Sequence, residues 1–174
     1  MRERPRPRPA DSGFTLVEVI AVVAIVGILA TMTALVMSST RGNASSASVK
    51  SDLRNYSAAA GEHWSSRFTY PDSPAGFALR DADDNGMPIT TGDSQFVAFV
   101  IPEGPNAGYI IFGANPDVDN VLVLSSWDGK TPRTTELTTL PTSPPEANTY
   151  GIPASVVDDD WAPKEGIRFP GGEG

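Results

Sequence analysis

The sequence has no cysteine and a single histidine, His63. No disulfide can form, and the usual cysteine and histidine zinc sites are excluded. The sequence also lacks the G-x-S-x-G turn of serine hydrolases and the glycine-rich loop that cradles phosphates. Its aspartates are numerous, but none is placed to suggest a general acid–base pair. These absences predict that the protein is not an enzyme and that it carries no organic cofactor.

Positive charge is scarce beyond the first residues. The net charge is −8, and residues 1–13 carry four arginines and two acids, a balance of +2, so the remainder carries −8 − 2 = −10. An acidic body disfavours nucleic-acid binding, which depends on lysine and arginine neutralising phosphates. A minor basic patch is kept as an alternative hypothesis. It would consist of Arg67, Arg80, Lys130 and Arg133.

Residues 1–13 and 14–37 differ sharply in character. Proline alternates with arginine in the first segment, so it forms neither a helix nor a core. The second, called the apolar segment here, has 24 residues, and its one charged residue is Glu18. As a helix it reaches about 36 Å, enough to cross a bilayer core. With basic residues before it, it predicts a single span with the N-terminus inside and the rest outside.

The apolar segment differs from a secretory signal peptide. A signal peptide has an apolar core of about 7–15 residues with a small-residue cleavage site after it. Here the run is longer, and the best processing signal precedes it. A plain signal anchor, or a disordered tail in front of one, stays an alternative interpretation.

Residues 38–64 are polar but patterned. Apolar side chains recur at steps of three and four along one face, which predicts an amphipathic continuation of the same helix. They are Val49, Leu53, Tyr56, Ala60 and Trp64. We expect this face to pack against a sheet. His63, beside Trp64, is interpreted as part of the helix end.

Residues 65–174 predict an exposed β-rich domain. Residues 65–94 form a loop, and the three strand candidates are 95–101, 109–112 and 121–125, joined as antiparallel neighbours. Residues 152–157 add a candidate edge strand. The Ser/Thr/Pro-rich tract 131–145 predicts little regular structure, as an unmodified linker or an O-glycosylated loop. The fold class is α+β: a long N-terminal helix on a small antiparallel sheet.

The junction of the first two segments carries a specific motif. Gly13, Phe14 and Glu18 stand at the start of the long apolar run. This arrangement resembles the processing site of type IV prepilins and pseudopilins. The resemblance implies the type IV pilin fold, cleavage after Gly13 by a prepilin peptidase, and N-methylation of Phe14. It departs from many pilins at Leu35, where they have proline, and in having no cysteine loop.

Glu18 is a candidate assembly residue on physical grounds as well. A lone carboxylate about 6 Å inside an apolar helix is costly and therefore functionally suspect. Cleavage after Gly13 creates an ammonium on Phe14, and a neighbouring copy's ammonium can pair with Glu18 and set the register between subunits. The alternative places Glu18 near lipid headgroups, protonated or solvated.

The expected function is that of a major pilin, a structural subunit that polymerises through its N-terminal helices into an extracellular filament. The resemblance implies further partners: the prepilin peptidase, an inner-membrane assembly platform and its ATPase. A pseudopilin of a secretion system, or a competence or minor pilin, is the alternative within the family. A membrane-anchored binding domain that never polymerises is the alternative from another class.

One metal site is a candidate. Asp81, Asp83 and Asn85, followed by Gly86, match the beginning of a calcium-binding loop. The twelfth position is Gly92 rather than glutamate, with Asp93 next to it. A solvated acidic loop without calcium is the alternative interpretation.

Overall fold

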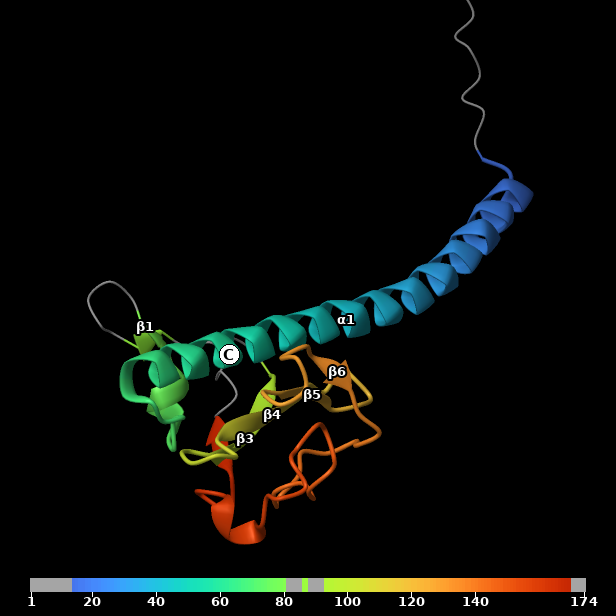
Figure 1. The fold of residues 1–174 in the computed structure, drawn as a ribbon. Helices are drawn as coiled ribbons and strands as arrows, with labels where there is room; N and C mark the ends of the chain where they lie inside the picture. The colour runs from blue at the N-terminus through green and yellow to red at the C-terminus, as the bar shows by residue number, and fades with distance from the viewer. Residues whose placement is uncertain (1–13, 81–85, 88–92, 170–174) are drawn as a thin grey trace, which may run out of the picture. The chain divides into compact units, whose positions relative to one another are not determined.

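The computed structural model describes residues 14–80, 86–87 and 93–169. The chain divides into two compact units, Met1–Thr40 and Arg41–Gly174. The second unit is called the head below. Helix α1 (Leu16–Arg67) runs through the boundary between the units (Figure 1).

The head is built on a five-stranded antiparallel sheet with the order β6-β5-β4-β3-β7. Its strands are β3 (Gln95–Ile101), β4 (Gly108–Ala114), β5 (Leu122–Ser125), β6 (Arg133–Thr134) and β7 (Ile167–Phe169). The three longest agree with the strand candidates of the sequence. A separate small sheet pairs β1 (Leu79–Arg80) with β2 (Gly86–Met87), after the short 3-10 helix η1 (Pro74–Phe77).

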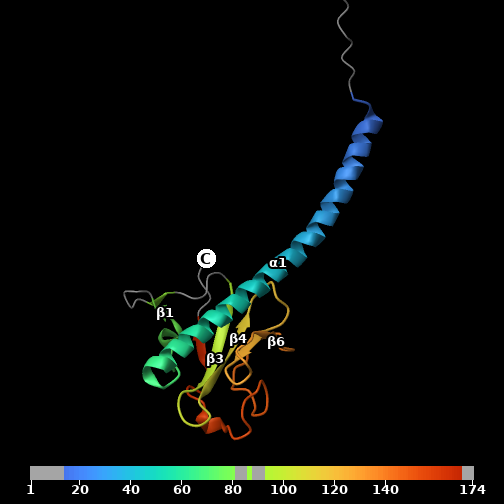
Figure 2. The ribbon, with the colours of Figure 1, turned by 45° about the horizontal axis from the view of Figure 1, so that its top comes forward.

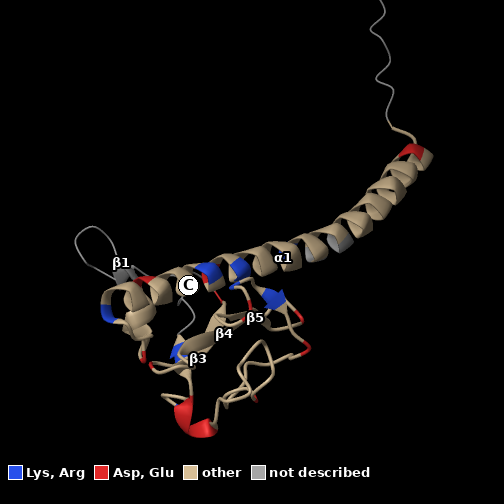
Figure 3. Ribbon diagram, in the orientation of Figure 1, with Lys and Arg blue, Asp and Glu red and all other residues tan. Residues whose placement is uncertain are grey.

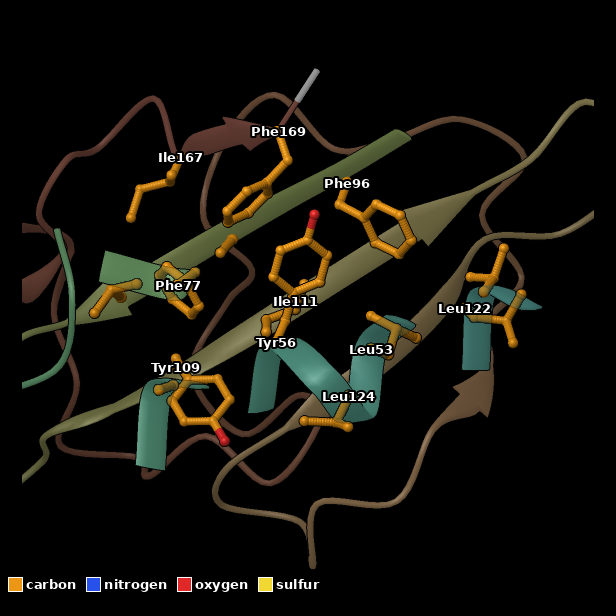
Figure 4. Close-up of a cluster of buried hydrophobic side chains, with 14 residues drawn as sticks. Leu53, Tyr56, Phe77, Phe96, Tyr109, Ile111, Leu122, Leu124, Ile167 and Phe169 are labelled. Atoms are coloured by element: carbon orange, nitrogen blue, oxygen red, sulfur yellow. The ribbon is translucent and has the colours of Figure 1, made fainter. Parts of the chain in front are cut away.

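The head portion of α1 lies across one face of this sheet (Figures 1 and 2). Val49, Leu53, Tyr56 and Ala60 are buried there, as the helical spacing predicts. Figure 4 shows Leu53 and Tyr56 among side chains of the sheet, and the Tyr56 ring lies beside the rings of Phe96 and Phe169. Burial of each large apolar side chain contributes about 1.5–3 kcal/mol, so this face holds the helix on the head.

Gly113 of β4 allows the helix and the sheet to pack closely. A Cβ at this position would lie 2.5 Å from a ring carbon of Phe96 and 2.8 Å from Val49 Cγ1. Those two side chains occupy the space that any other residue would need. The contact between α1 and the sheet therefore depends on glycine here.

The C-terminal tract covers the second face of the sheet. The sequence analysis made no prediction of what lies on that face. A second buried cluster joins Phe99 and Phe112 of the sheet to Ile152, Val156 and Trp161. The tract has little regular structure beyond β6, η2 (Asp158–Asp160) and β7. Its apolar residues are nevertheless part of the core.

The edge strand expected at residues 152–157 is wrong. The chain turns there, with the amide of Val156 donating to the carbonyl of Pro153 at 3.1 Å. The turn points Ile152 and Val156 into the second cluster. The edge position beside β3 is taken by β7, which pairs Ile167 with Ala98 and Phe169 with Phe96.

Candidate processing and assembly site

The described part of the first unit begins with a capped helix. The Thr15 hydroxyl accepts a hydrogen bond from the Glu18 amide at 3.3 Å, and its carbonyl accepts from the amides of Glu18 and Val19. Thr15 is therefore the N-cap of α1. The T-x-x-E pattern of a capping box is readable in the sequence, but the sequence analysis overlooked it.

Glu18 lies in the first turn of α1. The helix dipole places partial positive charge at this end, which favours a carboxylate. Phe14 precedes the helix by two residues, and it lines a groove of about 250 Å³ together with Glu18 and three valines: Val19, Val22 and Val23. The only charged side chain of the groove thus stands in an apolar lining beside Phe14.

The large apolar side chains that the structure describes in the apolar segment are exposed. Phe14 is 83% exposed, and Val19, the least exposed of this set, is 52% exposed. Within the described residues, one stretch, Leu16–Thr33, is long and apolar enough to cross a membrane, with a mean hydropathy of 2.5. Such a surface in water is unfavourable, so lipid or other helices must cover it.

Comparison with protein families decides the identity of this segment. Residues 8–34 match the prokaryotic N-terminal methylation motif. This N-terminal motif is typical of type IV pilins and pseudopilins. The fold of the chain agrees, because a long N-terminal helix packs on a five-stranded antiparallel sheet. A comparison with curated proteins gives no match.

The methylation motif implies processing by a prepilin peptidase. The hydrophobic helix is consistent with a membrane-anchored prepilin. Pilin-like proteins are generally structural rather than enzymatic. The predicted cleavage residue Gly13 lies outside the described residues, whereas Phe14 and Glu18 lie within them.

The candidate calcium ligands Asp81, Asp83 and Asn85 also lie outside the described residues. In the part of the chain that the structure does describe, no three carboxylate or histidine side chains gather as a metal site would need. The calcium loop therefore stays a prediction from the sequence.

His63 closes the C-terminal end of α1. Its Nδ1 donates to the Thr69 carbonyl oxygen at 2.8 Å, and its Nε2 accepts from the Arg67 guanidinium at 3.1 Å. Both ring nitrogens are thus engaged in holding the chain reversal after the helix. This arrangement leaves no imidazole nitrogen available as a general base.

The fold separates Arg67 from Arg133, two of the four cations that were considered as a basic patch. Arg67 lies in the last turn of α1, whereas Arg133 lies on the edge strand β6 and forms an ion pair with Asp128. Blue segments in Figure 3 are correspondingly dispersed over the head. The structure does not describe the side chain of Arg80.

Asp52 is a buried carboxylate that the sequence analysis missed. It is 7% exposed, and its Oδ2 accepts no hydrogen bond within the described residues. Burial raises the pKa of Asp52 from its ordinary value of 3.8 to about 6. Its position three residues after Val49 and four before Tyr56, both members of the buried stripe, was the available signal in the sequence.

Proposed function

We propose that this pilin-like protein is a major pilin, the structural subunit of a type IV pilus-like filament. The observation that carries the proposal is the apolar segment, which combines the methylation motif with exposed apolar side chains and Glu18 as its one charge. Packing these helices against one another replaces their contact with lipid. No catalytic activity is proposed.

Cleavage after Gly13 is the proposed trigger. The four arginines before it each cost roughly 2.5–3.5 kcal/mol at the centre of a membrane on the insertion scale, so they hold the precursor in the bilayer. Removing them lets the helix leave the membrane. The new ammonium of Phe14, N-methylated by the peptidase, then pairs with Glu18 of a neighbouring copy, in an apolar surrounding that strengthens the attraction.

The precursor would span the inner membrane once, with the leader inside and the head outside. The platform and ATPase that extract it are separate proteins. The exposed groove around Phe14 and Glu18 supports a role in subunit contact. It fits a pseudopilin or minor pilin equally well, and the abundance of the protein in surface filaments distinguishes these roles.

Mass spectrometry of protein sheared from the cell surface tests the proposal. We expect a sedimentable polymer whose chains begin at a methylated Phe14. Glu18→Ala should abolish the polymer, whereas Glu62→Ala, which removes an exposed acid farther along the same helix, should leave it intact. A chain that keeps Met1 and stays in the membrane fraction would support an anchored binding domain instead.

A further inference from the structure

Two neighbouring cations stand on the outer side of α1 in the head. Lys50 and Arg54 are one helical turn apart, with Lys50 half-buried and Arg54 exposed. Like charges at this spacing repel each other and weaken a helix. Neither side chain takes part in the two ion pairs formed by the described residues. The pair therefore lacks a counter-charge in the described part of its own head.

The surroundings of this pair are open. Ala47, Ser51 and Ala58 on the same side of α1 are all exposed, and their short side chains leave room for another surface to approach. In Figure 3 the blue segments on α1 contrast with red segments on the η2 turn and several loops. An acidic surface is the complementary partner for this face.

An acidic loop lies at a similar level along the same helix. Asp119 is exposed in the β4–β5 loop, and this loop is fastened to the first turns of the head's helix. The Ser45 hydroxyl donates to Asp117 Oδ2 at 3.2 Å, and a Cβ at Gly42 would lie 3.2 Å from the Asp117 carbonyl oxygen. The loop thus holds its carboxylates within about two turns of Lys50 along the helix.

Polymerisation would bring these two features of different copies together. Lys50 follows the apolar segment by 13 residues, about 20 Å of helix, so packed apolar segments keep the heads of neighbouring copies close at this level. The cations of one copy would then face either the cations or the carboxylates of the next. Only contact with carboxylates offsets the repulsion between Lys50 and Arg54.

We propose that Lys50 and Arg54 bind the Asp119 loop of a neighbouring copy, forming an electrostatic contact between heads. This inference rests on the proposed polymerisation and adds a contact that the apolar helices do not supply. A second copy is the favoured occupant because residues 14–174 carry a net charge of −10. Duplex DNA is less suited, because the other described cations are dispersed.

The test uses the full chain in cells with the assembly machinery, and it measures sedimentable protein over a range of salt concentrations. Lys50→Glu with Arg54→Glu should lower the yield of filaments about tenfold at low salt, because attraction becomes repulsion. Asp119→Lys should lower it similarly. Combining Asp119→Lys with the double reversal should restore most of the filaments.

A matched control is Lys130→Glu with Lys164→Glu, which changes the net charge equally at two other exposed cations of the head. It should leave the yield near that of the wild type. Tryptophan fluorescence checks that each variant folds, since all three tryptophans lie in the head.

Several results would overturn the inference. Wild-type filaments with an unaffected double reversal would overturn this contact alone, and so would a combined variant that fails to recover. The same holds if the double reversal abolishes binding of duplex DNA while assembly is unchanged. A wild-type chain that never sediments would overturn polymerisation together with this contact.

Discussion

Replacing Asp52 with asparagine should stabilise the head. The carboxylate is buried between Val49 and Tyr56, one turn away on either side along α1, and the described residues supply no hydrogen bond to its Oδ2. Burial raises its pKa from 3.8 to about 6 because the charged form loses hydration. Two pKa units correspond to about 3 kcal/mol, so the ionised side chain costs the folded head up to about that much.

The sign of the pH dependence follows from the raised pKa. Below about pH 4 the carboxyl is protonated in both states, and the folded head carries no penalty. The folded state holds this proton more tightly, so stability falls as pH rises from about 4 to about 6 and then levels off. Asp52→Asn removes this slope. Its advantage should be near zero at pH 4 and about 1–2 kcal/mol at pH 7, after the cost of a buried amide is subtracted.

The assay is urea unfolding of the detergent-solubilised full chain, followed by tryptophan fluorescence at several pH values. The three tryptophans report on the head alone because none lies in the first unit. Asp72→Asn, at an exposed carboxylate, serves as the control and should not change stability. The reasoning is refuted if Asp52→Asn is no more stable than the wild type at pH 7, or if its advantage is the same at pH 4.

Three further substitutions test the packing of the head in the same unfolding assay. Gly113→Ala should destabilise by about 1–3 kcal/mol, because its Cβ would lie 2.5 Å from the Phe96 ring; an unchanged midpoint would contradict the close packing. Phe68→Gly should stabilise by about 1 kcal/mol, because Phe68 ends α1 with a φ of 57° while its ring is 75% exposed; a loss of stability would show that the ring has a partner. Tyr109→Phe should cost about 1 kcal/mol by removing the buried hydrogen bond to Ser57 Oγ at 2.7 Å, and Tyr109→Phe in a Ser57→Ala background should cost less.

Much of the helix and sheet was predictable because each depends on a short repeating pattern. The stripe from Val49 to Ala60 follows the 3.6-residue period, and the apolar strand 95–101 lies between turn residues. The helix cap at Thr15 also depends on a local pattern, T-x-x-E, which is visible in the sequence but was overlooked. The misassigned strand at 152–157 shows the limit, because a run of apolar residues does not reveal whether the chain continues or turns.

The amino-acid sequence by itself determined the processing motif, the apolar segment and the charge of the body, because each is a property of neighbouring residues. Tertiary structure alone decided that the proline-rich tract covers the second face of the sheet and that β7 rather than residues 152–157 takes the edge. Those outcomes depend on contacts between residues far apart in the chain. Their energies come from removing apolar surface from water, and only the folded arrangement specifies which surfaces meet.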